Sequence, residues 1–271
     1  MAEIGLNPKT LIAFLFASAV VIWLLQKREV RINQRAVVAA MALVSLGFLL
    51  ILGIKGGTPL PFHWDFVPAI LAYRSERMAC FLGIALILTW LAIRPSSEEE
   101  SPLSYEPALV GAVMAFLFSA NAFSLLSAWV LADVLFTFRE GGLQSKASLA
   151  WLMSGLTGAL GFTAAITWQG HLPSLSIALF LLASLARARF FPLPLALRSR
   201  SDFLAALSAT TMGFYLLTLV SEGFQGALKL AILAWLILGA ALLVLRFRQQ
   251  RGKGVSLPWD CLLYTSPSPR D

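Results

Sequence analysis

The sequence predicts an all-α, polytopic integral membrane helix bundle of about nine transmembrane helices, the seventh of them broken by prolines. Three observations predict this class. The mean hydropathy is +0.79, with 58% hydrophobic and 13% charged residues, which excludes an ordinary soluble domain. Apolar runs long enough to cross a bilayer recur along the whole chain. The strictly alternating segments that would predict β-strands do not occur in the sequence.

Nine apolar runs have a length suited to spanning helices, because one crossing needs roughly 20 apolar residues. The runs Pro107–Ala120 and Pro173–Ala186 are short. Together the runs predict one transmembrane helical domain over residues 1–260. The predicted spans are Thr10–Gln26, Ala36–Ile54, Arg77–Ile93, Pro107–Ala120, Ala122–Phe138, Ala147–Thr167, Pro173–Ala186, Ser201–Val220 and Gly226–Leu245.

Residues 261–271 form a segment of a different kind. Their sequence, Cys-Leu-Leu-Tyr-Thr-Ser-Pro-Ser-Pro-Arg-Asp, resembles a transposase-type sequencing adapter translated in frame. We therefore expect this segment to lie outside the fold, and residues 1–260 to be the N-terminal part of a longer protein. The alternative is a genuine polar tail.

The lysines and arginines predict how the spans are oriented, because the cytoplasmic loops of membrane proteins are enriched in them. With the amino terminus outside, fifteen of the 21 lie in predicted cytoplasmic loops and five on the outer side; the last, Arg270, lies in the adapter-like segment. The net charge of +7 therefore reflects membrane orientation and does not indicate a nucleic-acid partner. We expect an integral protein of a bacterial inner (cytoplasmic) membrane, in contact with the lipid bilayer.

The stretch from Leu185 to Tyr215 carries the most informative pattern. An apolar helix runs into Arg187 and Arg189 and then meets Pro192 and Pro194. Proline removes a backbone donor and clashes with the preceding turn, so the seventh span should break here. Broken helices that carry charge at membrane depth are where transport proteins keep their ion sites. The alternative is an ordinary basic cytoplasmic loop with an interfacial Phe-Phe-Pro step.

Asp133 lies inside the predicted fifth span. A carboxylate at the centre of a spanning helix costs about 2.5–3.5 kcal/mol on insertion scales, so it normally faces the bundle and pairs. Arg139 marks the cytoplasmic end of this span only about 9 Å away along a helix, so an interfacial Asp133 paired with a basic loop remains equally open. The eighth span adds hydroxyl groups, most of which are structural in such helices. They belong to Ser208, Thr210, Thr211 and Tyr215.

The remaining polar residues give weak indications. His63 beside Asp65 offers only two possible metal ligands, and a solvated interfacial turn explains both better, as it does for His171. Cys80 and Cys261 predict neither a disulfide framework nor a metal site. No Cys/His cluster, nucleophile constellation or phosphate-cradling glycine loop occurs in the sequence. We therefore expect no catalytic centre, metal or cofactor in the chain itself.

Four short motifs occur in an order that a known family shares. They are Ser119-Ala-Asn121, Trp129-Val130 with Asp133 three residues later, Arg187-Ala-Arg-Phe-Phe-Pro192-Leu-Pro194 and Gly213-Phe-Tyr215-Leu. With them, the stretch from about Pro61 to Val220 resembles the antiporter-like, proton-translocating membrane subunits of respiratory complex I and of the related multi-subunit cation/proton antiporters. The resemblance implies an outside amino terminus, other membrane subunits as partners, and protons or monovalent cations as the transported ions. Any redox cofactors would then belong to partner subunits.

The resemblance also implies that the family's ion pathway is altered in this chain. The family's span-five glutamate aligns with Val130, so Asp133 would replace it from one turn further along, on a face that residues three apart share. The family's lysine aligns with Arg187, which stays protonated and can tune a carboxylate but cannot pass a proton itself. The family's histidines align with Pro194 and Ala205. The pathway is therefore either rebuilt around Asp133 and hydroxyl-held water, or it no longer pumps.

Three hypotheses follow from these patterns. The first is an ion-translocating subunit, at most part of an NADH:quinone oxidoreductase-type translocase, in which Asp133 pairs with Arg187 and takes up a proton when the pair breaks. The second is a non-conducting structural subunit with the same fold. The third is an unrelated secondary transporter or membrane enzyme. The candidate ion-translocation residues are Asp133, Arg187, Arg189, Ser208, Thr211 and Tyr215.

Overall fold

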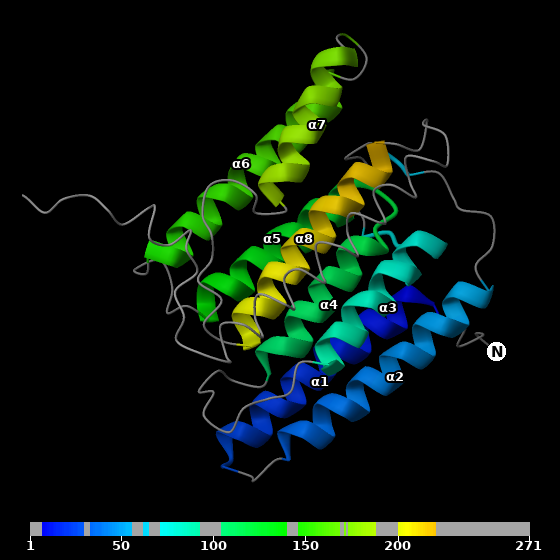
Figure 1. Cartoon of the computed structure of the whole chain (residues 1–271), viewed down its shortest axis with the longest axis vertical. Coiled ribbons are helices and arrows are strands. Elements are labelled where there is room, and N and C mark those ends of the chain that lie inside the picture. Colours follow the sequence, from blue (N-terminus) through cyan, green and yellow to red (C-terminus); the bar gives the residue numbers. More distant parts are fainter. Residues whose placement is uncertain are drawn as a thin grey trace, which may run out of the picture.

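The computed structural model describes residues 7–29, 33–55, 62–64, 71–92, 104–139, 146–168, 171, 173–187 and 200–220. Within these ranges the chain forms eight α-helices, and its only β-structure is isolated bridges (Figure 1). The predicted all-α class is therefore confirmed for the described part of the chain. The helices are α1 (Pro8–Lys27), α2 (Gln34–Lys55), α3 (Arg77–Ala92), α4 (Tyr105–Leu117), α5 (Ala122–Arg139), α6 (Lys146–Trp168), α7 (Pro173–Arg187) and α8 (Arg200–Val220).

Each of the first eight predicted spans overlaps one of these helices, whereas the ninth, Gly226–Leu245, lies outside the described residues. Three described segments are long and apolar enough to cross a membrane: Pro8–Lys27, Ala36–Lys55 and Ala122–Arg139. Shorter apolar segments lie in α3, α4, α7 and α8. The chain is thus a helical bundle with the features of a membrane protein.

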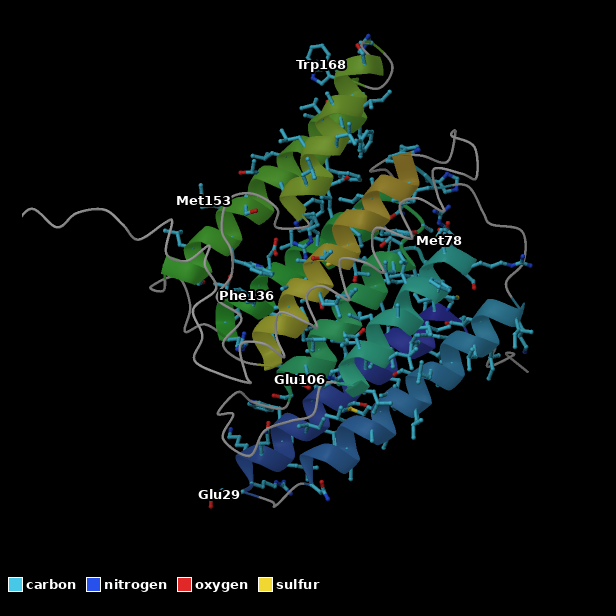
Figure 2. The ribbon with its side chains drawn as sticks, in the orientation of Figure 1. Glu29, Met78, Glu106, Phe136, Met153 and Trp168 are labelled. Atoms are coloured by element: carbon cyan, nitrogen blue, oxygen red, sulfur yellow. The ribbon has the colours of Figure 1, made fainter. Side chains whose placement is uncertain are left out.

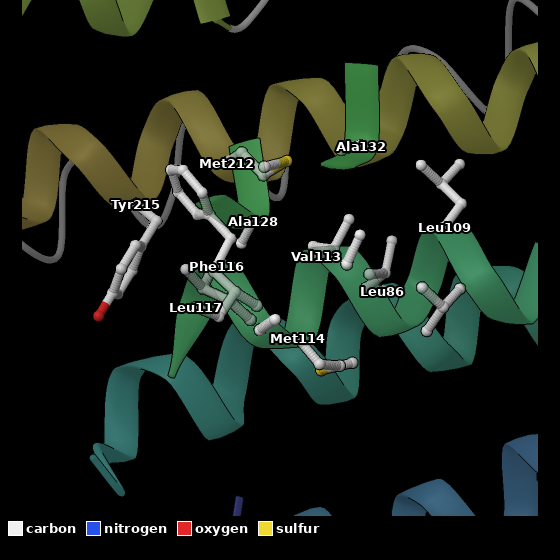
Figure 3. Packing of buried hydrophobic residues seen from close by; sticks show 14 of the residues in the cluster. Leu86, Leu109, Val113, Met114, Phe116, Leu117, Ala128, Ala132, Met212 and Tyr215 are labelled. Carbon is white, nitrogen blue, oxygen red and sulfur yellow. The ribbon is translucent and has the colours of Figure 1, made fainter. Parts of the chain in front are cut away.

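Helix α4 lies at the centre of the bundle, where it packs against α1 and α5 and, less extensively, against α8 and α3 (Figure 1). Every one of its residues is buried, as expected for a helix that is apolar on all sides. Its one charged side chain, Glu106, accepts a hydrogen bond of 2.8 Å from the Nε1 of Trp90 in α3. Figure 3 shows Val113, Phe116 and Leu117 of α4 in the buried cluster near α8. Close approach of α1 requires Gly111, because an added Cβ would lie 3.3 Å from atoms of Leu15 and Phe16.

Helices α6 and α7 form a hairpin that extends beyond the other helices (Figure 1). Two hydroxyl groups join them: Ser154 donates to the Ala186 carbonyl at 3.1 Å, and Ser176 donates to the Ala165 carbonyl at 2.7 Å. Small residues at the interface let the backbones approach, which is how helices associate in lipid. Helix α6 also packs closely against α5 at Gly158, where an added Cβ would lie 2.7 Å from the Trp129 ring.

The helical path is interrupted between α4 and α5, at residues 118–121. The backbone N–H and C=O groups at this interruption lose their helical hydrogen bonds, and inside a membrane protein they need other partners. Two segments from before α3 supply them, residues 62–64 and 71–74. On one side, the His63 amide donates to the Ala120 carbonyl at 2.9 Å and the Ala122 amide donates to the His63 carbonyl at 3.1 Å. On the other side, the Ala120 amide donates to the Ala72 carbonyl at 2.9 Å, and the Arg74 amide donates to the Phe118 carbonyl at 2.7 Å.

Polar side chains complete this junction. The Asn121 Oδ1 accepts hydrogen bonds from the amide and hydroxyl of Ser124, at 2.8 and 2.7 Å, and so caps the start of α5. The Ser124 hydroxyl in turn accepts a 2.8 Å hydrogen bond from the Ala72 amide. Burial raises the pKa of the neighbouring Tyr73 phenol above its ordinary value, so this ring stays neutral. The region that the sequence suggests to be an interfacial loop is thus, where described, docked onto the α4–α5 break.

Candidate functional site

An ion pair between α5 and α7 forms the centre of the candidate site. The Nη1 of Arg187, at the end of α7, lies 2.7 Å from the Oδ1 of Asp133 in α5. Only 1% of the arginine side chain and 5% of the aspartate side chain are exposed. The two residues that the sequence suggests as partners are therefore in direct contact and are buried among the helices.

Helix α6 also contacts the Asp133 carboxylate. The Nε1 of Trp151 donates a 2.9 Å hydrogen bond to the same Oδ1 atom that binds Arg187. The Trp151 ring also stacks on Phe136, one turn beyond Asp133, with 3.9 Å between ring centroids. Because this stacking fixes the indole, the N–H is held toward the carboxylate. The Asp133 carboxylate thus receives one charged and one neutral donor from two different helices.

The guanidinium group of Arg187 also contacts α5 and α8. Its Nη2 lies 2.9 Å from the Sδ of Met212 in α8, and its Cζ lies 5.0 Å from the ring centroid of Trp129 in α5. Such a cation–π contact stabilises a desolvated guanidinium. Arginine stays protonated in proteins, so the site holds a permanent positive charge.

Three buried polar atoms in this region have no hydrogen-bond partner among the described residues: the Nε of Arg187, the Nε1 of Trp129 and the hydroxyl of Ser208. Ser208 precedes Met212 by one turn of α8, so it lies on the face that meets Arg187. A buried polar group without a partner is costly and calls for an explanation. Ser208 thus shares a helix face with Met212, with a buried hydroxyl that can still accept or donate a hydrogen bond.

The other hydroxyl candidates on α8 are engaged differently. The Thr211 hydroxyl donates to the Leu207 carbonyl of its own helix at 2.8 Å. The Tyr215 hydroxyl donates a 3.1 Å hydrogen bond to the Oε2 of Glu76. That same oxygen lies 2.9 Å from the Nη2 of Arg74. The structure therefore places Tyr215 at a second ion pair, Arg74–Glu76, and not in the contact shell of Asp133.

Sequence reasoning missed Glu76, Arg74, Trp151 and Met212. The first two lie in Tyr73-Arg-Ser-Glu76-Arg77 just before a span, which is equally typical of a hydrated loop. Trp151 and Met212 have no local pattern that separates them from ordinary apolar helix residues. Their contacts depend on which helices meet, which a single sequence does not specify.

The expected shared face of Val130 and Asp133 on α5 is not found. Val130 is 50% exposed, whereas Asp133 is buried, so the two do not share a face as expected. Three residues turn a helix by about 300°, which leaves an offset large enough to turn Val130 outward while Asp133 faces inward. Ala205 of α8 is fully buried.

Several predicted residues lie elsewhere. His63 is exposed and uses its backbone at the α4–α5 break. Arg189, Pro192, Pro194 and Asp65 lie outside the described residues. Over the described ranges no group of three or more His, Cys, Asp or Glu side chains could hold a metal ion.

No protein-family model, curated protein or solved structure matches the chain.

Proposed function

We propose that the chain is an ion-translocating membrane subunit, with the proton as its ion, of a complex-I-like or cation/proton antiporter assembly. One observation carries the proposal: a carboxylate and a guanidinium, Asp133 and Arg187, are paired at 2.7 Å and almost fully buried between two helices of an apolar bundle. Ionisable residues inside membrane helices are costly, and they mark ion pathways and proton relays.

The chemistry of the two groups differs, and this assigns them different roles. Asp133 can take up and release a proton, whereas Arg187 keeps its own. While the guanidinium is in contact, the carboxylate stays ionised. When the guanidinium moves away, a carboxylate left in a low-dielectric site takes up a proton, and return of the guanidinium expels it. Arg187 is thus proposed as the electrostatic switch and Asp133 as the proton carrier.

The remaining candidates have supporting roles in this proposal. Ser208 and Thr211 contribute hydroxyls on α8, and Tyr215 binds a second carboxylate. Arg189 would extend the positive end of α7, and Pro192 with Pro194 would break the seventh span and give Arg187 room to move.

In the membrane, the chain would have nine spans and an outside amino terminus, in a bacterial inner membrane. The distribution of lysines and arginines supports this orientation. Partners would be other membrane subunits and the surrounding lipid, and any redox cofactor would lie in those partners.

The test is proton flux into vesicles that contain the chain with its co-purifying subunits, measured with an entrapped pH-sensitive dye under an imposed potential. Asp133→Asn keeps the size of the side chain but cannot take up a proton, so flux should fall to that of vesicles without protein. Glu106→Gln is the matched control, because Glu106 is also a buried carboxylate that accepts from an indole N–H. Undiminished flux in the Asp133 variant would reject the role.

A second candidate function is a non-conducting structural subunit, and one observation favours it. The Asp133–Arg187 pair contacts α5, α6, α7 and α8 directly, so it also holds the bundle together. This candidate predicts no flux in the unaltered protein. It also predicts that the joint replacement of Asp133→Leu and Arg187→Met leaves assembly intact, since a buried ion pair can be exchanged for apolar side chains without loss of stability.

A further inference from the structure

The Arg74–Glu76 pair is more buried than an ordinary ion pair in a hydrated loop. The Arg74 side chain is 1% exposed and its Nη2 lies 2.9 Å from the Oε2 of Glu76, whose side chain is 16% exposed. The Cζ of Arg74 also lies 5.5 Å from the ring centroid of Phe62. Tyr215, which is fully buried, donates its hydroxyl to the same carboxylate oxygen from α8. The carboxylate therefore has a buried side with two donors and a side open to its surroundings.

A series of aromatic rings separates this pair from Asp133–Arg187. From Arg187 the series runs through Trp129 to Phe116, with 6.1 Å between these two ring centroids, and on to Tyr215, with 6.0 Å between centroids. All three rings are fully buried. Figure 3 shows Phe116 and Tyr215 close together in the core. These rings form an apolar barrier between two ion pairs.

The two ion pairs lie at different places along the bundle. In Figure 2, Met78, which follows Glu76 at the start of α3, and Phe136, which follows Asp133 on α5, lie on opposite sides of the view. Helix α8 contacts both pairs: Met212 touches Arg187 and Tyr215 binds Glu76. These two α8 residues are only about 4.5 Å apart along the helix axis. A shift of α8 therefore changes the contacts of both pairs at once.

From this geometry we propose that Glu76 is a second proton-binding site, held by Arg74 and Tyr215 and coupled to the Asp133–Arg187 pair through α8. This inference rests on the proposed function and deepens it. The proton adds to the Glu76 carboxylate and weakens its contact with Arg74. The hydrogen bond from Tyr215 is then no longer to a charged acceptor, so this polar contact between α8 and the Glu76 segment weakens. The aromatic barrier keeps water from joining the two sites while this happens.

The test uses the same vesicle assay and three variants. Glu76→Gln removes the proton-binding group and should abolish flux, as Asp133→Asn does. Tyr215→Phe removes only the hydroxyl, leaves the contact with Phe116, and should lower flux about fivefold, the effect of one hydrogen bond on an equilibrium. Thr210→Val is the matched control on the same helix, because the Thr210 hydroxyl donates only to the Ala206 carbonyl, and its flux should be unchanged.

Melting temperature in detergent separates a functional role from a structural one. We expect Tyr215→Phe to melt close to the unaltered protein while its flux falls; if Glu76→Gln fails to assemble, Tyr215→Phe decides the question. Full flux in Tyr215→Phe, or in an assembled Glu76→Gln, together with lost flux in Asp133→Asn, overturns this inference and leaves the proposed function standing. Absence of flux in the unaltered protein overturns both.

Discussion

The Asp133 carboxylate depends on its partner more than most acidic side chains do, because it is surrounded by protein. Arg187 supplies a cation at salt-bridge distance, and Trp151 supplies a neutral N–H. A charge in such a place is tolerated only while it is paired. The stability of the folded protein therefore depends on whether the Asp133 charge keeps its partner.

Arg187→Met tests that link at a single residue. Methionine fills similar volume but leaves the carboxylate without a cation, and breaking a buried pair in this way costs about 3–5 kcal/mol. Protonating Asp133 removes the uncompensated charge, so the loss should be large at neutral pH and should shrink as the pH falls. The measurement is thermal unfolding in detergent at several pH values, compared with the unaltered protein. An equal loss at every pH would mean that Asp133 is not the group affected.

At the scale of the helices, the tight contact of α5, α6 and α7 fixes where the ion pair lies. Gly158 of α6 lies directly on the ring of Trp129, and Trp129 in turn lies under the guanidinium of Arg187. The ring is fully buried and is held by neighbours on its other sides, including Phe116 and Phe162. It therefore cannot move away from an intruding atom.

Gly158→Ala should for this reason destabilise the bundle. The new Cβ would lie 2.7 Å from the Trp129 ring and 3.3 Å from the Ala183 carbonyl oxygen, and overpacking of this kind costs about 1–3 kcal/mol. Gly47→Ala in α2 is the control, because nothing lies within 4 Å of its added Cβ; helix propensity should make that variant slightly more stable. Denaturant unfolding in detergent compares the two. Equal stability of both variants would contradict the close packing.

The sequence predicts the helices well but only part of their arrangement. Apolar runs identify α1 to α8. A carboxylate inside one span and an arginine at the end of another predict the Asp133–Arg187 contact. The docking of residues 62–64 and 71–74 onto the α4–α5 break has no periodic signature, because it depends on backbone hydrogen bonds between distant segments. Likewise, Tyr215 and Glu76 are separated by 139 positions. The outward direction of Val130 depends on which side of α5 faces the neighbouring helices.

At the scale of the whole molecule, the proposed orientation makes a prediction about accessibility. Glu29 follows α1 and His63 lies in the segment 62–64 that docks onto the α4–α5 break, and both side chains are exposed. Basic residues near Glu29 predict that it faces the cytoplasm, and His63 the outside. In a background of Cys80→Ser and Cys261→Ser, His63→Cys should react with a membrane-impermeant maleimide in intact cells, whereas Glu29→Cys should react only after the membrane is opened. The reverse labelling pattern would invert the proposed topology.

The docking of the early loop onto the α4–α5 break sets an order for the protein's biogenesis. The amide and carbonyl of His63 find their partners only in residues 120 and 122, which leave the ribosome later. Because chains are made from the amino terminus, α1, α2 and α3 enter the membrane before this contact exists. The loop must wait in a hydrated environment, at the bilayer surface or in the insertion machinery, until the following hairpin arrives. This junction can therefore form only after α1 to α4 and the start of α5 have been made.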